Sequence, residues 1–274
     1  MLRDLLVHVD GSDGGRQRVA FAVELAARAG ARLDGLHVTP PAEVQPRYKP
    51  SMVHTAQKKV AAQLAADARS AASIFREVTA KVLPDSRWFE VAGDMAAGIS
   101  ARARYADMVI LGQYEWQDPP HRHLLPVPSL VATQCGRPVL VVPANAPPTN
   151  LSNVAIAWDG SREAVRAIHD ALPLLRLAKS IDILTVVGPF GGRTEAGGKD
   201  LTAHLDHHGV EANTDIRQIV TRDEHGALRN EVAQGRYDLL VMGGYSHPLW
   251  MEVVFGGATP SILLSSKTPV LVSH

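Results

Sequence analysis

Hydrophobic and polar positions follow two different spacings along this chain. Short apolar runs, such as MVILG (108–112) and DLLVMG (238–243), alternate with longer stretches in which apolar residues recur every three or four positions. The short runs have no polar face, as expected of strands buried on both sides of a parallel sheet. The pattern therefore predicts an α/β protein in which right-handed βαβ crossovers connect the strands of a doubly wound sheet.

The same series of elements occurs twice. DLLVHVDGS (4–12) matches NVAIAWDGS (153–161), which lies 149 residues later. YADMVILGQY (105–114) matches YDLLVMGGY (237–245), and GRPVLVV (136–142) matches KTPVLVS (267–273), both at a spacing of 131 residues. Such internal similarity indicates a duplicated unit. We predict a first copy over 1–143, a Pro/Asn-rich linker over 144–152 and a second copy over 153–274.

Each copy is expected to hold five strands. In the first copy they are predicted near 4–9, 33–38, 87–91, 107–112 and 138–142, with helices near 14–29, 53–82, 94–104 and 127–135. In the second copy the strands are predicted near 153–158, 181–187, 214–220, 238–243 and 269–273. The change in spacing from 149 to 131 places 18 extra residues in the first copy, within 40–83. We therefore expect the helix there to be longer than its counterpart near 194–208.

Composition narrows the classes of protein that fit. The chain has 28 Lys and Arg against 28 Asp and Glu, a balance that does not favour nucleic acid or an anionic membrane as a partner. No apolar run approaches the roughly 18 residues of a membrane span. The N-terminus carries Asp4 and Asp10 and is predicted to be a strand, not a signal peptide. The single cysteine, Cys135, fits a reducing cytoplasm.

An Asp-Gly-Ser turn ends the first strand of each copy. Asp10-Gly11-Ser12 and Asp159-Gly160-Ser161 lie where parallel α/β sheets bind ligands, at the carboxyl ends of the strands. The two serines are predicted to cap the following helices. The aspartates have two interpretations, as acceptors for ribose hydroxyls or as ordinary turn residues.

Glycine-rich segments follow the fourth strand of the second copy. Gly243-Gly244-Tyr245-Ser246-His247 is followed by Gly256-Gly257-Ala258-Thr259-Pro260, which opens the last helix. We predict Thr259 as the N-cap and Pro260 as the first helical residue. The free amides at such a helix start form an anion site, so the two segments could close around a polyphosphate. The alternative is a flexible loop before a capped helix. Neither a G-x-G-x-x-G fingerprint nor a P-loop motif is present.

The duplication, the strand-one aspartate and the glycine pattern before a PVLV strand resemble the universal stress proteins in their tandem form. The most specific segment covers 242–274. This resemblance implies a Rossmann-like, five-stranded parallel sheet in each copy, in the order 3-2-1-4-5. It also implies that the two copies pair about a pseudo-twofold axis through their fifth strands.

In the ATP-binding branch of that family, a glycine loop holds the phosphates and the strand-one aspartate contacts the ribose. The resemblance therefore implies ATP or ADP, with or without Mg, in the second copy. Its binding residues would be Asp159, Val186 near the adenine, Gly243, Gly244, Ser246, His247, Gly256, Gly257 and Thr259. Ser246 departs from the family pattern, because it stands at a glycine position. His247 is either a phosphate donor or a surface histidine.

The corresponding loop of the first copy has lost these features. At the spacing of 131, Glu115 stands opposite Ser246, Leu125 and Pro126 opposite the glycine pair, and Pro128 opposite Thr259. A carboxylate repels phosphate, and each proline removes an amide that an anion would need. We expect nucleotide in the second copy only.

Three functional hypotheses remain from the sequence. The first is a stress-response protein that binds nucleotide and acts as a non-catalytic regulator or chaperone-like factor, with at most slow ATPase activity. The second is a nucleotide-free tandem module that acts through protein contacts. The third is a serine hydrolase built from Ser246, Glu252 and His274. The protein partners are unspecified, and a homodimer is possible.

The histidines have two interpretations, as metal ligands or as solvated surface residues. His204, His207 and His208 share one predicted helix, and His121 and His123 flank an arginine. No cysteine or carboxylate completes a ligand set at fixed spacing, so solvated surface histidines are predicted and no metal site.

Overall fold

The computed structural model describes residues 2–42, 50–113, 126–144, 151–187, 198–221, 224–245 and 258–274. The first copy contains β1 (Asp4–His8), α1 (Asp13–Ala29), β2 (Arg32–Thr39), α2 (Pro50–Thr79), β3 (Arg87–Ala92), α3 (Met95–Ala103), β4 (Met108–Gly112), α4 (Val127–Gln134) and β5 (Val139–Val142). The second contains β6 (Asn153–Ala157), α5 (Arg162–Leu175), β7 (Ser180–Val187), α6 (Gly198–His207), β8 (Asn213–Val220), α7 (Glu224–Val232), β9 (Leu239–Gly243), α9 (Ala258–Ser265) and β10 (Val270–Ser273).

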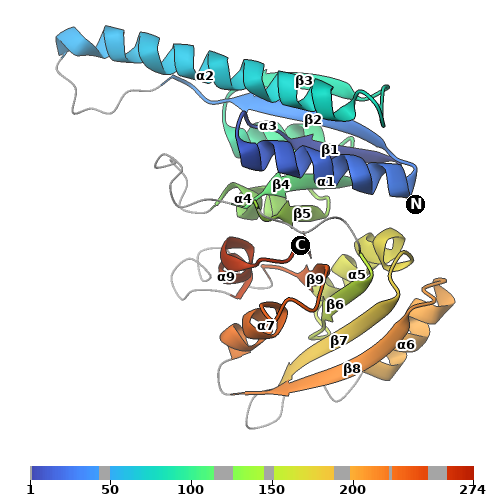
Figure 1. The fold of residues 1–274 in the computed structure, drawn as a ribbon. Helices are drawn as coiled ribbons and strands as arrows, with labels where there is room; N and C mark the ends of the chain where they lie inside the picture. The colour runs from blue at the N-terminus through green and yellow to red at the C-terminus, as the bar shows by residue number, and fades with distance from the viewer. Residues whose placement is uncertain are drawn as a thin grey trace.

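All ten of these strands belong to one sheet, in the order β3-β2-β1-β4-β5-β10-β9-β6-β7-β8. Within each copy every strand pair is parallel and the order is 3-2-1-4-5, which confirms the predicted fold class. The strands agree with the predicted ranges to within one residue at each end. The sheet runs through the molecule between helices on both of its faces (Figure 1).

The two copies meet where β5 and β10 pair antiparallel. Leu271 lies opposite Leu140, with Val270 opposite Val141 and Val272 opposite Val139. Leu140 and Leu271 are equivalent residues at the spacing of 131, so a local pseudo-twofold axis passes between them. Both strands are fully buried and, apart from Ser273, apolar, and the pairing covers edges that each copy would otherwise expose.

Two hydrophobic layers enclose the sheet. Helices α1, α2, α5 and α6 contribute to the layer on one face, and α3, α4, α7 and α9 to the layer on the other. Successive strand residues alternate between the layers, as Leu5 and Leu6 show. None of the helices in the described part of the chain is both long and apolar enough to span a membrane.

The helix caps follow the sequence in α1 and α5 but not in α9. The Ser12 and Ser161 hydroxyls accept the Gly15 and Ala164 amides at 3.0 and 3.1 Å, as predicted. The prediction that Thr259 caps α9 is wrong, because this helix already begins at Ala258. The Thr259 hydroxyl instead accepts the Tyr245 amide at 3.5 Å. The following proline still lies in the first turn, where its missing amide costs no helical hydrogen bond.

The insertion of the first copy lies in α2, which has 30 residues against 10 in α6. The expectation of a longer helix is therefore confirmed for the described residues. Phe75 of α2 packs on Gly35 of β2, where an added Cβ would lie 2.6 Å from the aromatic ring. Figure 1 shows α2 extending along β2 and β3 and beyond their ends.

Candidate functional site

In the second copy, the turn after β6 presents an available carboxylate. Asp159 is exposed, and its Oδ1 accepts the Ser161 amide at 2.9 Å. Gly160 has φ +71°, a left-handed conformation that favours glycine. Among the described residues, no ion pair involves Asp159. The second carboxylate oxygen of Asp159 thus has no partner in the described part of the chain.

The end of β9 is packed closely against its neighbours. A Cβ on Gly243 would lie 2.4 Å from the Ala164 backbone nitrogen in the first turn of α5. A Cβ on Gly244 would lie 2.5 Å from Val272 Cγ2 and 3.0 Å from Thr259 Cγ2. Packing alone therefore demands both glycines, and it brings the end of β9 against the start of α5.

Five of the implied nucleotide residues can be located. Asp159, Val186, Gly243, Gly244 and Thr259 lie at the carboxyl ends of neighbouring strands and in the first turn of α9. Several predicted residues fall outside the described residues; they are Ser246, His247, Gly256, Gly257, Glu252, Glu115, Leu125, His121 and His123.

His274 lies beside the end of β9. His274 Nδ1 is 3.2 Å from the Gly244 carbonyl oxygen, and the imidazole meets the Tyr245 ring edge-on at 6.5 Å. Glu163, also at the start of α5, is buried and lies 2.5 Å from Arg162 Nε. Glu163 and His274 thus each have a partner among the described residues.

In the first copy, a buried arginine, Arg18, lies between the ends of β1 and β4, the strands that correspond to β6 and β9. Arg18 Nε donates to the His8 carbonyl oxygen at 2.7 Å, and its Nη2 lies 2.5 Å from Asp10 Oδ2. The guanidinium also lies over Gly112, where a Cβ would be 1.9 Å from Nη1. Burial alone would raise the pKa of Asp10, but Arg18 and Ser12 hold it well below its usual range. The first carboxylate is therefore committed to a cation of its own chain.

Helix α2 also clamps the β1–α1 turn of the first copy. Asp67 Oδ1 accepts the Gly11 amide at 2.8 Å, and the Ser70 hydroxyl donates to the Gly11 carbonyl oxygen at 3.2 Å. The short α6 of the second copy reaches no equivalent contact within the described residues. The turn after β1 and the turn after β6 thus differ in two ways. Only the first has an arginine paired with its aspartate, and only the first is contacted by the long helix α2, among the described residues.

Two stacked histidines lie beneath the Asp10–Arg18 pair. The His8 and His37 rings are 6.4 Å apart and inclined by 12°, and His37 Nδ1 is 2.8 Å from the Val9 carbonyl oxygen. Burial, together with the Arg18 charge, lowers the pKa of His8 to about 3. His8 is therefore neutral throughout the physiological range.

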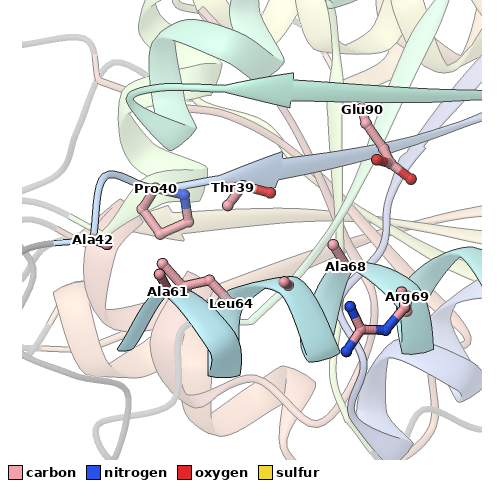
Figure 2. A pocket seen from close by; sticks show the side chains of 9 residues that line it. Thr39, Pro40, Ala42, Ala61, Leu64, Ala68, Arg69 and Glu90 are labelled. Atoms are coloured by element: carbon pink, nitrogen blue, oxygen red, sulfur yellow. The ribbon is translucent and has the colours of Figure 1, made fainter. Parts of the chain in front are cut away.

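Two adjoining cavities open on this side of the first copy. One, of about 570 Å³, is lined by His8, Asp10, Arg18, His37 and Asp67 together with apolar residues and a few further polar ones. The other, of about 440 Å³, lies between α2 and the ends of β2 and β3. Figure 2 shows Ala61, Leu64 and Ala68 of α2 facing Thr39 and Pro40, with Arg69 and Glu90 at one end.

Sequence reasoning missed Arg18. It occupies the buried face of α1 beside Val19 and Ala22, and the equivalent residue of α5 is the fully buried Ala167. A single arginine within an apolar stripe is the signal that could have identified it, since such a charge is buried only when paired. The comparison of the two copies then shows that only the first carries this charge.

Comparison with known proteins places this geometry among related folds. The model of the Universal stress protein family matches residues 1–143. A universal stress protein from Archaeoglobus fulgidus DSM 4304 superposes with a TM-score of 0.68 at 15% identity, over 98% of this chain and 95% of that one. A functionally unknown protein from Pseudomonas aeruginosa PAO1 superposes with a TM-score of 0.56 at 15% identity, over 99% and 92%. No curated protein matches the sequence.

Proposed function

Because the chain belongs to the universal stress protein family, we propose that it is a stress-response protein whose second copy binds ATP or ADP. One nucleotide binds per chain, and the first copy binds none. The observation that carries this proposal is the exchange of Arg18 in the first copy for Ala167 in the second.

The exchange decides which aspartate can accept ligand hydroxyls. Asp10 is neutralised by Arg18, and the guanidinium occupies the space between the ends of β1 and β4. Among the described residues Asp159 has only the local Ser161 amide as a partner, and the buried Ala167 brings no charge to it. A ribose can therefore bind to the second aspartate without breaking an ion pair, which would be costly at a partly buried site.

The helix that follows the fourth strand supports the same asymmetry. In α4 the N-cap is Pro126, which makes no side-chain cap bond, and Pro128 lies in the first turn without an amide. In α9 the first two residues, Ala258 and Thr259, both carry amides. Because free amides at a helix start attract anions, phosphates are better accommodated at α9.

The described surroundings favour binding over hydrolysis. Glu163 Oε1 is paired with Arg162, and His274 Nδ1 faces the Gly244 carbonyl oxygen, so one atom of each group already has a partner. The protein therefore acts through its nucleotide-bound state, as a regulator or chaperone-like factor for protein partners.

Matched aspartate variants test this proposal by titration calorimetry with ATP. Asp159→Ala should weaken binding by about 10-fold or more, because a charged hydrogen-bond acceptor is lost. Asp10→Ala, at the equivalent place in the first copy, should leave the Kd unchanged within about 2-fold. The reverse pattern would refute the assignment to the second copy, and an absence of binding by the unaltered chain would favour the nucleotide-free module.

A further inference from the structure

The outermost strand of the second copy, β8, has an unpaired edge within the described part of the chain. It is the last strand in the order of the sheet, and its listed partner is β7 alone. Figure 1 shows β8 at the margin of the sheet, opposite to the end formed by β2 and β3, where the long α2 lies. An unpaired strand edge is a template on which another strand can pair.

The side chains and backbone of β8 fit such a pairing. Two large apolar side chains are exposed, Ile216 by 42% and Val220 by 72%. The Ile216 amide donates to Asp215 Oδ1 at 2.9 Å, which indicates that this donor points away from β7. Because backbone groups alternate in direction along a strand of a parallel sheet, Thr214 and Gln218 also direct theirs outward.

The sequence of β8 is complementary to itself. Two molecules related by a twofold axis perpendicular to the sheet would pair these strands antiparallel, as β5 and β10 pair within the chain. Residues opposite each other must share a face, so the axis lies between two copies of one residue. At Asp215 or Arg217 this would set like charges opposite each other, which is destabilising. At Ile216 it sets two exposed apolar side chains opposite each other.

The register centred on Ile216 also pairs opposite charges. Asp215 of each molecule then lies opposite Arg217 of the other, so the pair occurs twice. These residues form a non-hydrogen-bonded pair, the kind in which opposing side chains are closest. Asp215 is exposed, and none of the ion pairs among the described residues includes it. The exposed Gln218 lies opposite Thr214, where both backbones direct their hydrogen-bonding groups at the partner.

Arg217 is held in place and still has donors to offer. Its Nη1 lies 3.0 Å from Asp182 Oδ2, 3.4 Å from Glu231 Oε1 and 3.2 Å from the Tyr237 hydroxyl oxygen. All three contacts use the same nitrogen, and the side chain remains 36% exposed. The rest of the guanidinium fork can therefore donate to a carboxylate of another molecule. Since the side chain is already ordered, this contact costs little further conformational entropy.

We propose that β8 is an interface at which a second molecule of this chain pairs antiparallel, with the twofold axis at Ile216. The occupant is a second molecule because the charged and apolar residues of the strand complement one another in this register. A twofold contact of this kind uses the same surface on both molecules and closes as a dimer. The interface goes beyond the proposed function and needs no nucleotide.

Sedimentation velocity of the full chain, without nucleotide and over a dilution series, tests this proposal. We expect a monomer–dimer equilibrium for the unaltered chain. Asp215→Arg sets arginine opposite Arg217 at both ends of the interface, so the Kd for dimerisation should rise at least 10-fold. The matched control is Asp85→Arg, the same change of charge at an exposed residue in the turn before β3. It should alter the Kd by less than 2-fold.

A charge exchange makes the test specific for the register. Arg217→Asp alone should also fail to dimerise, because aspartates then lie opposite each other. An equimolar mixture of Asp215→Arg and Arg217→Asp should form a mixed dimer, since every opposing pair again has opposite charges. Circular dichroism checks that both variants fold. If Arg217→Asp does not fold, Ile216→Lys takes its place as a single variant, and it should abolish the dimer by setting two lysines opposite each other.

Four results would overturn the proposal. The first is an unaltered chain that stays monomeric at every concentration. The second is dimerisation of Asp215→Arg, or of Ile216→Lys, with unchanged affinity. The third is a mixture of two folded charge variants that stays monomeric. The fourth is a series of ever larger species, which would indicate pairing between different edges of the sheet.

Discussion

At the scale of single residues, Arg18 distinguishes the carboxyl end of β1 in the first copy from the equivalent end of β6 in the second. Its guanidinium joins Asp10, the His8 carbonyl oxygen and the surface of Gly112, whereas the second copy has a buried alanine at the same place. Sequence comparison of the loops also predicts an asymmetry, from Pro126 and Pro128. It could not show that the first aspartate is paired, because that depends on the direction of a long side chain across the β1–β4 gap.

The buried His8 makes stability depend on pH. Its pKa of about 3 in the folded protein lies below the unfolded value of about 6.5. Its contribution to stability is therefore fully present above pH 6.5 and is lost as the pH falls toward 3. Between pH 7 and 4.5 the free energy of unfolding should fall by about 3 kcal/mol on account of this residue.

Urea denaturation at several pH values checks this contribution. His8→Phe keeps a ring of similar size and cannot titrate, so it should remove most of that loss. Parallel pH dependences for the variant and the unaltered protein would show that His8 is not the group responsible.

At the scale of elements, most of the architecture follows from the sequence pattern. The strand ranges and the position of the insertion are predictable, because buried strands have a clear apolar signal and the repeat spacing changes at one place. The start of α9 is not predictable in this way. Thr259 has the composition of a cap, yet its hydroxyl binds the Tyr245 amide, a contact that only the tertiary structure creates.

The long helix α2 should depend on the absence of a side chain at Gly35. In Gly35→Ala the new Cβ would meet the Phe75 ring at 2.6 Å and force the helix outward. We expect a loss of about 1–3 kcal/mol in the free energy of unfolding. Denaturant titration measures this change, and adding Phe75→Leu should recover part of it. A Gly35→Ala protein of unaltered stability would contradict the tight packing of α2 on β2.

At the scale of the whole molecule, the two copies form one continuous sheet. The antiparallel pairing of β5 with β10 places Leu140 opposite Leu271, at equivalent positions of the repeat. The apolar fifth strands indicate that these edges need a cover, and the family resemblance supplies the pairing. The register between them becomes apparent only in the fold. Since the sheet is continuous, we expect the two copies to unfold together.

Truncation of either leucine should therefore destabilise the same cooperative transition. Leu140 and Leu271 are both fully buried, so Leu140→Ala and Leu271→Ala should each cost about 3 kcal/mol. Because the residues share a contact, the double variant should differ from the sum of the single ones by about 0.5 kcal/mol or more. Separate unfolding transitions, with each variant affecting only one, would contradict a shared interface.

We propose that one nucleotide binds per chain, in the second copy. Native mass spectrometry of the full chain with excess ATP counts bound nucleotides directly. We expect a single added ATP, and its loss in Gly256→Pro, because proline removes an amide from the glycine-rich segment before α9. Two ATP molecules per chain, or one that persists in Gly256→Pro, would contradict it.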